Sequence, residues 1–183
     1  YPHSHGGILS GKLKDFDNLK GFMKIKKDLL TLPEMLFLLG YRAYFGTAVS
    51  VAFYPLRGRV VPSKQKDTYY NRAEELLEDL NKWISKSDKP FFAYVQLGDL
   101  HAPLNPPKSC RNFFGEIKNL PNIGWWDFKR RNEQRGKKFQ EYKENRIMLY
   151  NNALRYVDHS IEQFYRFLED SGLIDSTVLI ITA

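Results

Sequence analysis

A nearly continuous apolar run at residues 91–97 constrains the fold of this chain more than any other segment. The run lies between Lys89-Pro90 and Gly98, and it is typical of a strand buried on both faces of a parallel sheet. Before it, residues 67–85 repeat apolar side chains at helical spacing, with acidic side chains largely on the opposite face. An amphipathic helix that leads into such a strand indicates an α/β sheet with helical crossovers.

The first third of the chain extends this alternation. Thr31 and Glu34 form a potential capping box, and Gly40 supplies a left-handed stop, so residues 31–40 predict a helix. Residues 41–51 are β-branched and aromatic, which predicts a strand after that helix. The opening residues 1–13 and the segment 54–64 lack periodicity, and both are expected to be loops.

The second half of the chain predicts one more helix and one more strand. Apolar residues advance by threes and fours over residues 154–168, until Ser171-Gly172 ends the pattern. A turn is expected at residues 175–176, and another buried strand at residues 177–182. Residues 102–145 are rich in proline, asparagine, aromatic and basic residues, so we expect a long excursion there.

Length and composition favour a single domain with an anion-binding surface. The 183 residues, 43% of them hydrophobic, can build one core, and we expect a single α/β domain over residues 1–183. The formal net charge of +7 indicates affinity for anions, although a solvated basic surface explains it equally well. The single cysteine, Cys110, excludes an internal disulfide and is expected to be a free thiol.

Apolar runs in this chain reach only a few residues, whereas a membrane span requires about 20. We therefore expect no membrane span. No signal segment occurs in the sequence as given, which favours a cytoplasmic location but leaves the compartment open. The oligomeric state is also left open.

His101 is the main candidate for a functional residue. It lies four residues after Leu97, close to Asp99. Ligands of open α/β sheets bind beyond the carboxyl ends of the strands, where a loop after this strand would lie. An imidazole there could donate a hydrogen bond to an oxyanion or protonate a leaving oxygen. Alternatively, His101 is a loop histidine bonded to a neighbouring carbonyl or to Asp99.

Three stretches resemble the sulfatases of the alkaline phosphatase superfamily. PFFAYVQLGDLHAPLNPP, residues 90–107, is similar to the family's strand that delivers a histidine to the anion site. YNNALRYVDHSIEQFYRFLEDSGLIDSTVLIITA, residues 150–183, resembles the helix, turn and strand before its Asp-His-Gly or Asp-Asn-Gly metal motif. YPHSHGG and LTLPEMLFLLGYRAYF resemble the segment after its nucleophile. The resemblance implies an incomplete three-layer alkaline phosphatase-like sheet, with His101 as a catalytic and substrate-binding residue.

Other family features are absent from these 183 residues. The family's nucleophile is a Cys or Ser in C/S-x-P-x-R, oxidised to formylglycine, and it precedes the segment that resembles residues 1–7. Its divalent metal, usually calcium, is held by two early acidic residues and by the Asp-His or Asp-Asn pair that would follow Ala183. We therefore expect an internal fragment that is inactive and binds no metal by itself. Cys110 lacks the proline and arginine of the nucleophile motif.

A further departure concerns the anion site. Many sulfatases carry Gly-Lys-x-His where this chain has Gly46-Thr47-Ala48-Val49-Ser50, so the lysine and histidine that grip the sulfate are missing. This difference favours a divergent member acting on a sulfated or phosphorylated small molecule or glycan. The alternative within the superfamily is a phosphodiesterase or a phosphoglycerol transferase.

The remaining candidates have mainly structural explanations. His5 matches an HG pair of the family but is expected to be a turn residue, and His3 is expected to be exposed. Asp158 is taken as structural, and adjacent helix residues such as Asp158 and His159 do not share one face, so no metal site is expected there. Trp125 and Trp126 either stack on a ligand or anchor the excursion.

A noncatalytic anion-binding module is the alternative from another class. The basic residues between Lys129 and Lys143 could hold a polyanion, and such binding would weaken steeply with salt. Acidic residues interrupt this cluster, and no nucleic-acid-binding fold signature accompanies it. A nucleic-acid partner is therefore not expected.

Overall fold

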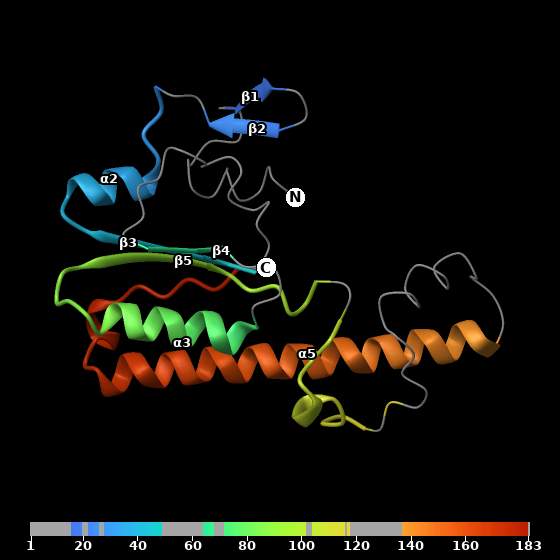
Figure 1. Cartoon of the computed structure of the whole chain (residues 1–183). Helices are drawn as coiled ribbons and strands as arrows, with labels where there is room; N and C mark the ends of the chain where they lie inside the picture. The colour runs from blue at the N-terminus through green and yellow to red at the C-terminus, as the bar shows by residue number, and fades with distance from the viewer. Residues whose placement is uncertain are drawn as a thin grey trace. The chain divides into compact units, whose positions relative to one another are not determined.

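The computed structural model describes residues 16–19, 22–25, 28–48, 64–67, 72–101, 104–115, 117 and 137–182. The chain divides into two compact units, Tyr1–Gly98 and Asp99–Ala183. Figure 1 labels the helices and strands of both units.

The first unit contains a parallel sheet of three strands. The central strand β3, Arg42–Thr47, pairs with β4, Lys64–Asp67, on one side and with β5, Phe91–Gln96, on the other. The register between β3 and β5 runs from Arg42 opposite Phe91 to Thr47 opposite Gln96. Parallel neighbours require crossover connections, and α3 lies between β4 and β5 in the chain. The predicted α/β class is therefore confirmed.

Alternate residues of β3 point to opposite faces of this sheet, as strand geometry requires. Arg42 and Tyr44 reach α3, Ala73–Ile84, through hydrogen bonds to its backbone and to Asp79. On the opposite face, the ring of Phe45 lies 6.0 Å from that of Phe92 and 6.5 Å from that of Tyr94, between ring centroids. In Figure 1, α2 and α3 lie on the two sides of this sheet.

Helix α3 turns the predicted apolar face inward but starts later than the sequence pattern indicated. Its buried residues are Ala73, Leu76, Leu77, Leu80, Trp83 and Ile84. The prediction of helix from residue 67 is wrong, because Asp67 is the last residue of β4. The sequence Lys-Gln-Lys-Asp carries no strand signal, and its pairing with β3 overrides local preference.

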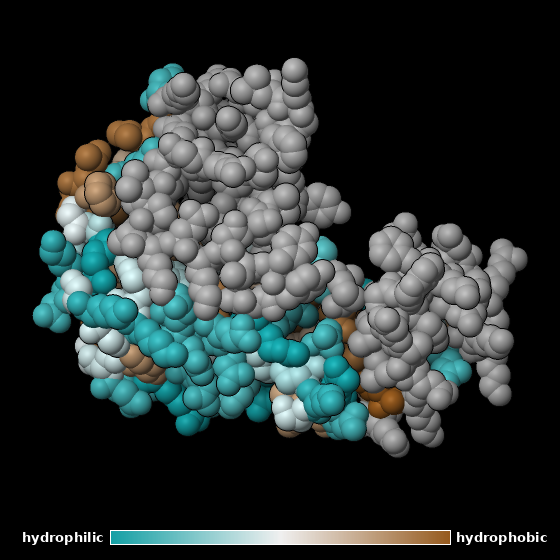
Figure 2. All heavy atoms as spheres, viewed as in Figure 1, coloured by the Kyte–Doolittle hydropathy of each residue, from teal (hydrophilic) through white to brown (hydrophobic). Residues whose placement is uncertain are grey.

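The predicted capping box of α2, Leu32–Leu38, is confirmed. The Thr31 N–H donates to Glu34 Oε2 at 2.7 Å, which satisfies one of the free amides at the helix start. Gly40 has a φ of 87°, as the left-handed stop requires. Apolar side chains nevertheless cover the outward face of α2, and they gather at the left of Figure 2. The exposed ones are Leu32, Met35, Phe37 and Leu38.

A hairpin near the N-terminus was not anticipated from the sequence. Strand β1, Phe16–Leu19, pairs with β2, Phe22–Ile25, in antiparallel register. Of the loops expected at residues 1–13 and 54–64, only Lys64 lies within the described residues, and there the prediction is wrong, because Lys64 begins β4. Residues 49–51 of the predicted strand lie outside the described residues as well.

The second unit contains one long helix, α5, Lys137–Asp170, of 34 residues. It includes the predicted helix at residues 154–168 and begins inside the segment expected to be an excursion. Residues 137–148 are rich in Lys, Glu, Gln and Arg, which are good helix formers, and they extend the helix toward the N-terminus. Gly172, with φ of 66°, follows its end, and the predicted turn is the short helix η3, Ile174–Ser176.

Two expectations about strands are wrong. Residues 177–182 form no strand, and their side chains are mostly exposed, with Val178 at 88% and Ile180 at 78%. β-branched composition does not make a strand without a partner for its backbone groups, and none of the described strands pairs with this segment. The second correction concerns β5, whose residues are half-buried rather than fully buried.

No helix in the described ranges has both the length and the apolar character needed to cross a bilayer.

Candidate functional site

The carboxyl ends of β3 and β5 hold a neutral hydrogen-bonded pair. The Thr47 hydroxyl donates to Gln96 Oε1 at 2.9 Å, and Thr47 is fully buried. The Ala48 N–H donates to the Gln96 carbonyl at 3.0 Å, which extends the ladder past the last residue of β3. Thr47 occupies the position at which the resemblance would place a sulfate-gripping lysine. The Thr47–Gln96 pair thus provides hydrogen bonding but no positive charge at the ends of β3 and β5.

Tyr44 lies near that end of β3, on the face of the sheet that packs against α3. Its ring lies so close to Gly46 that a Cβ atom at position 46 would be 2.9 Å from Tyr44 Cε1. Its hydroxyl donates to Asp79 Oδ2 at 3.0 Å. Burial, and then the hydrogen bond to Asp79, raises the pKa of Tyr44 above its ordinary value of 10.0. Tyr44 therefore stays neutral and acts as a packing residue rather than as a nucleophile or base.

His101 lies five residues after Gln96, in the second unit, and its side chain is exposed. Apolar residues flank it on both sides. Leu104 is buried in a cluster with Leu149 and Ala153 of α5, and Leu100 packs against the same cluster. The imidazole is therefore presented to solvent from a segment whose neighbours are fixed on α5. Its role in catalysis and substrate binding stays a prediction.

The loop after His101 is held by one buried amide. Asn152 of α5 donates through Nδ2 to the carbonyl of Arg111 and accepts through Oδ1 from the Phe114 N–H at 3.2 Å. The Arg111 side chain in turn donates from Nε to the Pro106 carbonyl at 3.1 Å. It also donates from Nη2 to Asn105 Oδ1 at 2.7 Å. These bonds connect the two ends of the segment 105–114 to each other and to α5.

Cys110 is a free, half-buried thiol, as predicted. It ends the short helix η2, Lys108–Cys110, and its Sγ lies 3.7 Å from the hydroxyl of Ser109.

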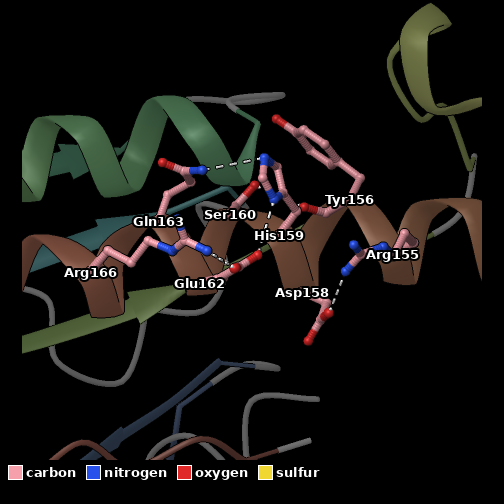
Figure 3. Close-up of polar contacts among 8 residues, drawn as sticks. All are labelled: Arg155, Tyr156, Asp158, His159, Ser160, Glu162, Gln163 and Arg166. Atoms are coloured by element: carbon pink, nitrogen blue, oxygen red, sulfur yellow. Dashed lines mark hydrogen bonds and ion pairs between the residues drawn. The ribbon is translucent and has the colours of Figure 1, made fainter.

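Asp158 and His159 have separate partners on α5. Asp158 accepts from Arg155 at 2.9 Å, whereas His159 Nδ1 lies 3.3 Å from Glu162, so the two side chains point apart in Figure 3. Glu162 also accepts from Arg166 at 2.6 Å. The hydrogen bond from Arg166, followed by that of His159, lowers the pKa of Glu162. The group is an exposed set of ion pairs.

Within the ranges that the structure describes, no three His, Cys, Asp or Glu side chains are grouped so that they could hold a metal ion. The described residues therefore do not fit a divalent metal. His3, His5, Trp125, Trp126 and the basic residues 129–135 lie outside the described ranges.

Comparison with known proteins identifies the family. The family model described as Sulfatase matches residues 5–183, which is nearly the whole chain. The chain therefore belongs to the sulfatase family, and this confirms the family predicted from the three sequence stretches. As a member it is a sulfatase-like hydrolase, of a family that acts on sulfated substrates and generally uses a divalent metal. No curated protein sequence matches the chain.

Asn152 and the Thr47–Gln96 pair were not identified from the sequence. Asn152 had a detectable signal, because it is a polar residue among the positions that repeat at helical spacing with Leu149 and Tyr156. A polar side chain on an apolar face requires a partner, and here the partner is the loop backbone. The Thr47–Gln96 pair follows only from the register between β3 and β5.

Proposed function

We propose that this chain is the central part of a hydrolase that cleaves sulfate esters, in which His101 binds the ester. The imidazole contacts a nonbridging oxygen or protonates the leaving oxygen. The family match over residues 5–183 carries this proposal, and the place of His101 just after β5 supports it.

The remaining machinery is proposed to come from polypeptide outside these residues. The C/S-x-P-x-R motif does not occur in the 183 residues, so the formylglycine nucleophile must be supplied elsewhere. A divalent metal, expected to be calcium, would be held there as well. The chain by itself is therefore expected to bind its substrate class weakly and to turn nothing over.

Phosphate-ester chemistry is the second candidate, because position 47 carries a threonine where the resemblance places a sulfate-gripping lysine. A lysine at position 47 would offer a full charge to the anion, whereas the buried Thr47 hydroxyl is already donated to Gln96. A phosphodiesterase or a phosphoglycerol transferase would keep the same scaffold with a Thr or Ser nucleophile. Its substrate would be a phosphorylated small molecule or glycan.

A pair of chromogenic esters separates these candidates. The protein, extended to include its natural flanking sequence, is assayed with para-nitrophenyl sulfate and with bis-para-nitrophenyl phosphate, and His101→Ala is compared with wild type. An alkyl sulfate is assayed beside them, because para-nitrophenolate leaves without needing a proton. With the alkyl ester, loss of general acid catalysis lowers the rate by about 100-fold or more. His159→Ala is the matched control, since His159 is an exposed histidine on α5.

Two outcomes contradict the proposal. With the alkyl ester, a His101→Ala rate within about threefold of wild type would exclude a direct role, because it corresponds to roughly 0.6 kcal/mol of barrier. Wild-type protein that turns over none of these esters, yet binds single-stranded DNA with a steep salt dependence, would instead support the noncatalytic anion-binding module.

A further inference from the structure

We infer that Asn152 is a positioning residue for His101. The buried amide of Asn152 clamps the loop that follows β5 onto α5, and the clamp fixes the place from which the imidazole is presented. This inference depends on the proposed function for the role of His101. The clamp itself is argued only from contacts within the second unit.

The first step concerns the residues on either side of His101. Leu104 is 2% exposed and packs with Leu149 and Ala153 of α5, and Leu100 packs against the same cluster. Leu100 directly precedes His101 in the chain, so its packing against this cluster limits where the backbone of His101 can lie. The position of His101 therefore depends on how well this segment stays on α5.

The second step concerns what keeps the segment there. Asn152 has 0% exposure, and both halves of its amide are bonded to the loop, to the Arg111 carbonyl and the Phe114 N–H. A buried amide with both functions satisfied is costly to break, because each freed group would remain buried without a partner. Asn152 is thus a specific lock and not merely a side chain that fills space.

The third step connects this lock to Leu104. Arg111, whose carbonyl Asn152 holds, donates its guanidinium N–H groups to Pro106 and Asn105. These residues immediately follow Leu104 in the chain. Release of Arg111 from Asn152 would loosen the turn at residues 105–111 and, through it, the Leu104 attachment. His101 lies three residues before Leu104.

The experiment is a double-mutant cycle in the protein with its natural flanking sequence. We expect Asn152→Ala to lower kcat by about tenfold, since small misplacements of a reacting group cost this much or more. In the His101→Ala background the same change is expected to cost nothing further, because the clamp acts through His101. Asn151→Ala is the matched control, since Asn151 is the exposed neighbour on the same helix, and it is expected to leave kcat unchanged.

A conservative variant changes one of the two bonds of the clamp. Asn152→Asp keeps an acceptor for the Phe114 N–H but places a buried carboxylate oxygen against the Arg111 carbonyl, so a loss of kcat at least as large as in Asn152→Ala is expected. If Asn152→Ala does not fold, Arg111→Ala tests the next link, because it removes the guanidinium bonds to Pro106 and Asn105 and keeps the carbonyl that Asn152 binds. If Asn152→Ala lowers kcat by the same factor in the His101→Ala background as in wild type, the inference is overturned.

Hydrogen exchange provides a readout that is independent of activity. We expect the amides of residues 104–114 to exchange about tenfold faster in Asn152→Ala, and unchanged in Asn151→Ala. The His101 ring resonances are expected to shift in Asn152→Ala only. Unchanged exchange and an unchanged His101 signal would overturn the clamp while the proposed function stands. If wild type hydrolyses none of these esters, the proposed function fails, and the exchange experiment still decides about the clamp.

Discussion

Two arginines show how differently the same side chain acts in the two units. Arg42 of β3 lies over the end of α3, where its guanidinium carbon is 4.2 Å from the centre of the Trp83 ring. It donates to three backbone carbonyls at 3.0 to 3.2 Å, those of Trp83, Ile84 and Ser87. Arg166 of α5 donates to Glu162 at only 2.6 Å, but its side chain is 63% exposed.

The shorter contact is expected to be the weaker one. Water competes for both partners of an exposed ion pair, and ordering two long side chains costs entropy, so such pairs contribute little. The carbonyls that Arg42 binds include the last ones of α3, whose other donors are the turn amides of Lys86 and Ser87 at 3.4 and 3.3 Å. The lower exposure of Arg42 and its three acceptors, rather than distance, therefore determine which interaction matters.

Replacement of Arg42 should have the largest effect. We expect Arg42→Met to lower the free energy of unfolding by about 2 kcal/mol, because it removes hydrogen bonds from a charged donor and a cation–π contact. Arg42→Lys is expected to retain part of this, since an ammonium cannot form the same fork. Urea unfolding measures the free energy of unfolding of both variants. Lys82 is exposed, so Lys82→Met is the control. If Arg42→Met lowers the free energy of unfolding by no more than Lys82→Met, the contrast between the two arginines fails.

The buried Tyr44 and the half-buried Tyr94 should give a smaller, pH-dependent effect. Burial raises the pKa of Tyr94 from 10.0 to about 12, and the pKa of Tyr44 is raised as well. The unfolded chain loses these protons first, so the stabilisation is complete below pH 10 and is lost as pH rises through about 12.

Denaturation midpoints at pH 9, 10 and 11, values chosen to cover the range around the ordinary tyrosine pKa of 10.0, measure this slope. Tyr94→Phe should flatten the decline above pH 10, because the substituted residue has no proton to lose. An equally steep decline in Tyr94→Phe would assign the loss of stability to other groups.

Glu162 should give the smallest effect. Its pKa is lowered by Arg166 and His159, so its contribution is present above the ordinary value of 4.5 and is lost as pH falls through the lowered pKa. Because the carboxylate is exposed, we expect Glu162→Gln to leave the thermal midpoint within experimental error. A carboxyl titration by NMR would sharpen the comparison, since Arg166→Gln should return the pKa of Glu162 toward 4.5.

Local signals were sufficient for some elements. The capping box and the glycine stop of α2 fall within ten consecutive residues, and the apolar face of α3 repeats along one helix. The strand β4 and the segment 177–182 show the opposite. The first is polar and pairs with β3, and the second is β-branched and forms no strand. Strand formation depends on a neighbour, and the choice of neighbour is not encoded within a few residues.

The candidate site shows the same contrast between features with a local sequence signal and features that depend on distant residues. The place of His101 after β5 follows from the strand pattern and the glycine that ends it. The bond from Asn152 to Arg111 joins residues 41 positions apart, so only the folded structure could pair them. From the sequence, Asn152 could be recognised as a polar residue in need of a partner, but the partner could not be named.

The close approach of Tyr44 to Gly46 limits how this strand can change over evolutionary time. Any larger residue at position 46 would meet the Tyr44 ring at 2.9 Å. A larger residue at position 46 therefore requires the Tyr44 ring to move or position 44 to carry a smaller side chain. Either change disturbs the hydrogen bond from Tyr44 to Asp79, so the two positions are coupled.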